Sequence, residues 1–185
     1  GHCFGMNPPA PRAASAALAF ALLILPGCAP PPGQEQGLPA FEKLALSGER
    51  AFEETRRFLE TGRRDAGTPG AERAAAFIAK RLGELGLKPE IDEFADQTPD
   101  GIATFRNLTA VIKGRSPGAI ILVSHYDTKS GMPDGFEGAN DSGSSVGLLM
   151  EMARAILATD APPAMNIMLA FLDGEECRRA YGPRD

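Results

Sequence analysis

Two nearly continuous apolar runs of strand length, with a helical pattern between them, constrain the fold of this chain most. Residues 118–124 (GAIILVS) and 165–172 (MNIMLAFL) have the composition of strands that are buried on both faces of a sheet. Between them, residues 142–158 carry apolar side chains at helical spacing, which indicates a helix with a wide buried stripe. A strand, a helix and a strand in this order predict a parallel pair joined by a right-handed crossover.

The segments before this unit have two kinds of pattern. Apolar side chains at helical spacing predict helices over residues 48–61 and 70–85. Alternating polar and apolar residues predict two strands, 88–95 and 103–113, joined by the turn-rich segment 97–101. An antiparallel pair that leads into a parallel unit predicts an α/β domain with a mixed sheet.

The N-terminal residues predict export rather than a folded element. An uncharged apolar run, residues 13–25, follows Arg12 and is shorter than the roughly 20 residues that cross a bilayer. Such a run behind a basic residue is typical of a secretory signal peptide. It leads into Leu-Pro-Gly-Cys, which resembles the bacterial lipobox, and Cys28 would then be lipidated. An ordinary signal peptide followed by an unrelated cysteine is the alternative.

These features divide the chain into three parts. We expect residues 1–27 to be a signal peptide with a lipobox and residues 28–40, rich in Pro and Gly, to be a flexible tether. Residues 41–185 have the length and composition of one domain. The chain is therefore expected to be an exported bacterial lipoprotein, facing the periplasm or anchored to the outer membrane, that meets a membrane only through its lipid.

The charge and aromatic content argue against a nucleic-acid partner. The net charge is −5, the pI is about 5.2, and no stripe of Lys and Arg is available to neutralise phosphates. The chain has no Trp and two Tyr, which leaves few aromatic faces on which bases could stack. The sequence leaves the oligomeric state open.

Five acidic or imidazole side chains stand where the predicted parallel strands end. His125 and Asp127 follow the first strand, Glu175 and Glu176 follow the second, and Asp141 begins the crossover helix. Because ligands gather at the carboxyl ends of strands in open α/β sheets, we expect these side chains at one edge of the sheet. An imidazole and several carboxylates suit a divalent metal such as zinc, with one carboxylate left to accept a proton.

The same residues suggest a division of roles. Asp127, two residues after His125 on an extended backbone, can accept the second imidazole N–H and fix the tautomer. Asp141 can reach a metal. Glu175 and Glu176 are adjacent and are expected to point in different directions, so that one binds metal and the other acts as a base. Each residue alone has a simpler interpretation, as a surface histidine, a helix N-cap or a solvated carboxylate.

Three segments carrying these residues resemble a known superfamily. SHYDTK, GANDSGSSVG and FLDGEE, in this order and spacing, are similar to the zinc-dependent aminopeptidases and glutaminyl-peptide cyclotransferases. The similarity covers about residues 45–185. It implies a three-layer α/β/α sandwich with a mixed, mainly parallel sheet, incomplete at the C-terminus. It also implies one or two zinc ions and a peptide substrate with a free N-terminus.

The resemblance assigns a role to each of the five residues. His125, Asp141 and Glu176 are implied metal ligands, Asp127 the supporting carboxylate and Glu175 the general acid and base. In the two-metal peptidases the aspartate at the position of Asp141 bridges both ions. In the cyclotransferase branch a single zinc is typical, and the histidine of the first motif need not be a ligand.

Three functions follow as hypotheses. The first is a zinc aminopeptidase, a hydrolase that removes N-terminal residues from peptides by metal-activated water. The second is a glutaminyl-peptide cyclotransferase, a transferase that forms N-terminal pyroglutamate. The third is a non-catalytic, peptidase-like lipoprotein that serves as an interaction module.

The resemblance also implies ligands that this stretch lacks. The superfamily requires a further aspartate and a final histidine, but no histidine follows His125, and Asp185 is too close to Glu176 to be that aspartate. We expect both residues beyond Asp185 and interpret the chain as the N-terminal part of a catalytic domain. Without them, the stretch is expected to bind metal weakly or not at all.

Overall fold

A four-stranded mixed sheet organises the part of the chain that the computed structural model describes, residues 44–176. The strands are β1 (Glu90–Thr98), β2 (Gly101–Ile112), β3 (Ser116–His125) and β4 (Met165–Leu172), in the spatial order β1-β2-β4-β3. β1 and β2 pair antiparallel, as do β2 and β4, whereas β3 and β4 pair parallel. The predicted antiparallel hairpin, parallel unit and mixed sheet are confirmed.

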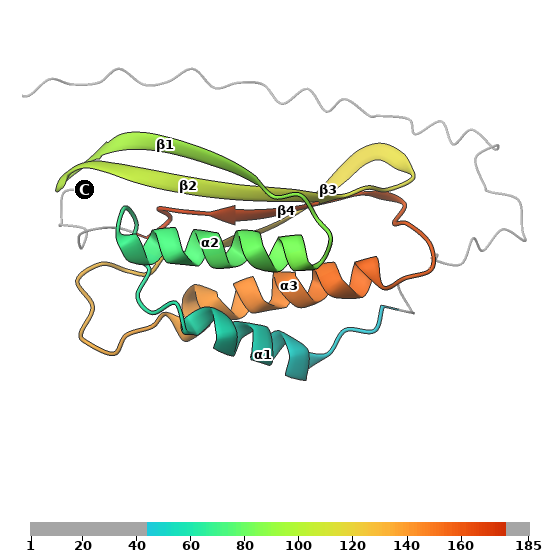
Figure 1. The fold of residues 1–185 in the computed structure, drawn as a ribbon, viewed down its shortest axis with the longest axis horizontal. Helices are drawn as coiled ribbons and strands as arrows, with labels where there is room; N and C mark the ends of the chain where they lie inside the picture. Colours follow the sequence, from blue (N-terminus) through green and yellow to red (C-terminus); the bar gives the residue numbers. More distant parts are fainter. Residues whose placement is uncertain (1–43, 177–185) are drawn as a thin grey trace, which may run out of the picture. The chain divides into compact units, whose positions relative to one another are not determined.

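Three helices lie on one side of this sheet (Figure 1). They are α1 (Gly48–Leu59), α2 (Pro69–Glu84) and α3 (Ser144–Leu157), and each matches a predicted helix within a few residues. The hydroxyls of Ser47 and Thr68 accept hydrogen bonds from the first turns of α1 and α2, which explains where these helices begin. The described residues thus form an α/β domain in which α2 and α3 pack on the mixed sheet and α1 packs on α3.

The core lies between the helices and the sheet. Its members are side chains with no or almost no exposed surface, contributed by all three helices, by β2 and β4 and by the residue after β3, and the largest are Tyr126, Phe58, Phe171, Ile78, Leu82, Leu108, Leu169 and Val146. α1 also packs closely on α3, where Gly147 leaves no room for a Cβ against the backbone of Ala51 and the hydroxyl of Thr55.

The two apolar runs differ in burial, contrary to the expectation that both would be covered on both faces. β4 lies inside the sheet, and Ala170, which points away from the helices, is 7% exposed. β3 lies at the edge, and Ile121 and Val123 are 57% and 54% exposed. These two side chains point away from the helical layer, and within residues 44–176 no helix covers that face (Figure 1).

Several predictions concern residues outside the described range. The signal peptide with its lipobox, Cys28 and the tether 28–40 all precede residue 44. Within residues 44–176, no helix is both long enough and apolar enough to cross a membrane.

Candidate metal centre

The candidate site lies where β3 and β4 end side by side. The two strands are parallel, and His125 at the end of β3 is paired with Leu172 at the end of β4. Past this pair, the backbone N–H of Tyr126 still donates to the carbonyl of Leu172 at 2.9 Å. Residues that follow the two strands are therefore held next to each other, as the sequence pattern predicted.

A tight turn, Ala139–Gly143, brings Asp141 to the same place. Gly138, with a positive φ of 56°, precedes the turn, and its carbonyl accepts a hydrogen bond from the N–H of Gly143 at 3.0 Å. The hydroxyl of Ser142 donates to the carbonyl of His125, which attaches the turn to the end of β3. α3 has Gly143 at its N-cap position without a side-chain hydrogen bond, so Asp141 does not cap this helix.

The imidazole of His125 lies between two aspartates. Its Nδ1 is 3.2 Å from Oδ1 of the buried Asp127, and its Nε2 is 2.9 Å from Oδ1 of Asp141, whose side chain is exposed. Nε2 is also 3.8 Å from Oε2 of Glu175. Burial lowers the pKa of His125, but hydrogen bonds and charges of these three carboxylates outweigh this effect and raise the pKa overall.

Asp127 joins the ends of both strands. Its side chain is fully buried and accepts hydrogen bonds from Nδ1–H of His125 and from the backbone N–H groups of Glu175 at 3.3 Å and Glu176 at 3.0 Å. The contact with the imidazole was predicted from the sequence. The two backbone contacts were not, because they depend on the exact path of the chain after β4.

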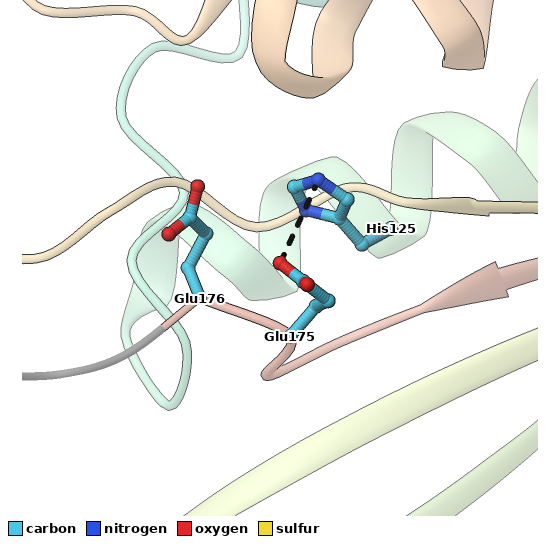
Figure 2. A group of neighbouring side chains, drawn as sticks. All are labelled: His125, Glu175 and Glu176. Carbon is cyan, nitrogen blue, oxygen red and sulfur yellow. Dashed lines mark ion pairs between the residues drawn. The ribbon is translucent and has the colours of Figure 1, made fainter.

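Glu175 and Glu176 both approach His125 (Figure 2). One imidazole nitrogen and one oxygen from each glutamate lie within 4.8 Å of one another. The expectation that adjacent glutamates would point apart is wrong, because Gly174 takes a φ of 77° and the backbone no longer alternates as in a strand. Burial, followed by the charges of Asp141 and Glu175, raises the pKa of Glu176.

Two charged side chains near the site are buried. Asp173 is 8% exposed and accepts a hydrogen bond from the N–H of Arg106, and burial above all raises its pKa to about 6. Arg64 is fully buried beside the segment that follows β3. No pattern in the sequence distinguishes these two residues from surface charges, because their burial depends on the packing of distant loops.

The donor set fits a divalent metal. Zinc in proteins is bound by imidazole nitrogen and carboxylate oxygen, and His125, Glu175 and Glu176 offer one such atom each within a small volume. Asp141 adds a fourth donor next to Nε2 of His125. Asp127 is placed to orient the imidazole, as partners of metal-binding histidines commonly do.

Comparison with known proteins gives consistent matches. Residues 107–182, which include all five candidate side chains, match the family described as Peptidase family M28. The Bos taurus protein named "Glutaminyl-peptide cyclotransferase-like protein" is 34% identical over 131 residues, covering 66% of this chain and 34% of that protein. The Bos taurus "Glutaminyl-peptide cyclotransferase" is 31% identical over 133 residues, covering 64% and 37%.

Solved structures agree with these matches. An Acidobacteriales bacterium glutaminyl cyclase matches with a TM-score of 0.69 and 35% identity over 80% of this chain and 52% of its own. A Porphyromonas gingivalis glutaminyl cyclase matches with a TM-score of 0.66 and 28% identity over 75% and 49%. The chain thus spans about a third of the length of the curated relatives and about half of the solved chains. Its fold, its motifs and its relatives show that the chain belongs to the superfamily of zinc-dependent aminopeptidases and glutaminyl-peptide cyclotransferases.

Proposed function

We propose that this chain carries the metal-binding and proton-transferring part of a glutaminyl-peptide cyclotransferase. The observation that carries the proposal is the meeting of His125, Glu175 and Glu176 at the ends of β3 and β4, with Asp141 within hydrogen-bond distance of the imidazole. That geometry suits either activity of the superfamily. The names of the relatives and solved structures favour the cyclotransferase over the aminopeptidase, which is the first hypothesis from the sequence.

The proposed metal ligands are His125, Asp141 and Glu176. Zinc bound there would polarise the carbonyl of the substrate's glutamine side-chain amide. Glu176, the less exposed of the two glutamates, reaches this place from β4, and Asp141 reaches it from the turn before α3. Asp127 would hold the imidazole of His125 with Nε2 toward the metal.

Glu175 is the proposed proton carrier. Its exposed carboxylate lies 3.8 Å from Nε2 of His125, at the solvent side of the cluster, where a substrate amine could reach it. In the reaction, the α-amine of the N-terminal glutamine attacks the carbonyl carbon of the side-chain amide, and a C–N bond forms. Glu175 takes a proton from that amine and gives it to the amide nitrogen, whose C–N bond breaks, so that ammonia leaves.

One assay tests the proposal. The full-length protein with added zinc is incubated with a peptide that begins with glutamine and, separately, with an aminoacyl-arylamide. Loss of one ammonia from the peptide, with no amino acid released from either substrate, is expected. Release of free amino acids without pyroglutamate would refute the cyclotransferase. The variant Glu175→Gln is the control, because it keeps the shape of the side chain and loses the base.

The aminopeptidase remains the second candidate because of one observation. Residues 107–182 match a family described as a peptidase family, and this range holds the whole candidate site. In that reaction Glu175 would take the proton from the attacking water, and the same five residues would serve. The arylamide arm of the assay measures this activity directly.

A further inference from the structure

Arg64 is the largest fully buried side chain among the described residues, and it lies behind the candidate site. It belongs to the loop between α1 and α2, and the carbon of its guanidinium lies 4.6 Å from the centre of the Phe58 ring. Arginine is almost never fully buried unless its charge and its N–H groups are satisfied. Its hydrogen-bond partners therefore indicate what it does.

Those partners are backbone carbonyls of three separate segments. Nε donates to Tyr126 at 2.8 Å, Nη1 to Gly62 at 2.9 Å, and Nη2 to Gly138 at 3.2 Å. In addition, the backbone N–H of Arg64 donates to the hydroxyl of Thr128 at 3.0 Å. The guanidinium thus spans from its own loop to the two segments that supply the candidate metal ligands from β3 and from the turn before α3.

Two of these carbonyls belong to residues within three positions of a site residue in the chain. Tyr126 lies between His125 and Asp127, so its carbonyl moves with both side chains. Gly138 precedes the turn that carries Asp141, and its carbonyl also accepts the N–H of Gly143, which closes that turn. One planar group therefore links the backbone of the His125 segment to the backbone of the Asp141 turn.

The surroundings of Gly138 leave no space for a side chain. A Cβ added there would lie 2.6 Å from the carbonyl oxygen of Asp141, 2.8 Å from Cγ2 of Thr128 and 3.1 Å from Nη2 of Arg64. Close packing of this kind leaves the turn little freedom to move relative to the guanidinium. The position of Asp141 thus depends on the side chain that occupies position 64.

The chemistry of the side chain matters as well as its size. Burial lowers the pKa of Arg64 to about 10, against the raising effect of Asp127, Glu137 and Asp65, so the group remains charged at neutral pH. Its planar fork donates in several fixed directions at once. A lysine ammonium is a single point, and we expect it to reach fewer of the three carbonyls.

We propose that Arg64 is a positioning residue that fixes the separation between the His125–Asp127 segment and Asp141, and thereby sets the affinity of the site for zinc. This inference rests on the metal site of the proposed function. It does not depend on which reaction the site performs.

Zinc binding to the full-length protein, measured by competition with a chromophoric chelator, tests the proposal. Arg64→Met keeps most of the apolar stem and removes all three donors, and we expect a roughly 10- to 100-fold weaker affinity for zinc. Arg64→Lys should retain part of the wild-type affinity for zinc. The matched control is Leu82→Ala, which empties a fully buried position about 20 Å along α2 from its start at Pro69. This control should lose stability and keep its zinc affinity.

A second measurement needs neither metal nor activity. Amide hydrogen exchange at Gly143, whose N–H closes the turn, should speed up more in Arg64→Met than in Leu82→Ala, once both are corrected for their free energies of unfolding. If the arginine variants and the control show the same zinc affinity and the same exchange, the proposal is overturned. If Arg64→Met does not fold, the same two measurements are compared between Arg64→Lys and Leu82→Ala, and the same outcome overturns the proposal.

The two proposals fail differently. A wild-type protein that binds zinc and forms no pyroglutamate refutes the cyclotransferase. The role of Arg64 is then still tested by the zinc affinity and the amide hydrogen exchange of its variants. A wild-type protein with cyclotransferase activity, whose arginine variants match the control, refutes the role of Arg64 alone.

Discussion

The carboxylate of Asp127 accepts a hydrogen bond from the backbone N–H of Glu176 at 3.0 Å, and so one buried side chain connects the ends of β3 and β4. The same carboxylate holds Nδ1–H of His125. The orientation of the imidazole and the path of the chain through both glutamates therefore share one acceptor. This sharing explains why Asp127 and Glu176, which are 49 positions apart in the sequence, can belong to one site.

Asp127→Asn should disturb both functions of this side chain. The amide keeps one acceptor oxygen and turns an NH₂ group toward at least one of three donors, so a buried N–H loses its partner. We expect a loss of about 1–3 kcal/mol in the free energy of unfolding of the metal-free protein, measured with urea. We also expect a roughly 10- to 100-fold weaker affinity for zinc. Asp134→Asn, at an exposed position, is the control; equal behaviour of the two variants would contradict the assignment.

Glu175→Gln and Glu176→Gln should separate proton transfer from metal binding. With Glu175 as the base, its replacement should lower the rate of the reaction roughly 10²- to 10⁴-fold and leave the zinc affinity unchanged. With Glu176 as a ligand, its replacement should weaken zinc binding itself. Zinc titration and the rate at saturating zinc distinguish these effects. The assignment of the two glutamates is reversed if Glu175→Gln is the variant that loses zinc.

The order of elements was predictable because it depends on strong local patterns. The apolar runs of β3 and β4 and the stripe of α3 leave few alternatives, and parallel pairing then brings His125 and Glu176 to one edge. The direction of each side chain after the strands end was not predictable. Gly174, with its positive φ, redirects the chain so that Glu175 and Glu176 approach His125 together.

Burial of charge was the other feature that sequence could not supply. Arg64 follows Arg63 in the loop after α1, and no sequence pattern distinguishes the two arginines. Arg63 pairs with Asp65 near the surface, whereas Arg64 is enclosed by Phe58 and by the carbonyls of Tyr126 and Gly138. Only the docking of this loop on the segment after β3 decides which arginine is buried.

Cys28→Ser should release the protein from membranes if the lipobox is used. The serine hydroxyl is not a thiol and cannot receive the lipid through a thioether, so the variant loses the proposed anchor. Incorporation of a labelled fatty acid in a bacterial host, followed by separation of membrane and aqueous fractions, measures this directly. Cys177→Ser, the matched control, should still incorporate the label. An unlabelled wild-type protein would contradict the lipoprotein assignment.

Glu151 provides a test of stability that is independent of the site. This carboxylate, 1% exposed on α3, accepts hydrogen bonds from the N–H of Ser47 at 2.9 Å, from Nε of Arg50 at 3.1 Å and from Nε of Arg154 at 2.6 Å. The bond with Arg154 is the main cause that lowers its pKa from 4.5 to about 2, against the raising effect of burial. Because the pKa is lower in the folded protein, the carboxylate stabilises the fold above pH 4.5.

This stabilisation should be lost as the pH falls from about 4.5 to about 2, since the folded protein then binds the proton as well. Glu151→Gln should therefore cost about 3 kcal/mol of unfolding free energy at pH 7, by the size of the shift in pKa. Near pH 2 the variant and the wild type should converge. Urea unfolding of the wild type and the variant across this pH range measures the cost at pH 7 and the convergence near pH 2. The exposed Glu90→Gln is the control. A difference that stays constant with pH would mean that the shape of the side chain, and not its charge, holds α1 against α3.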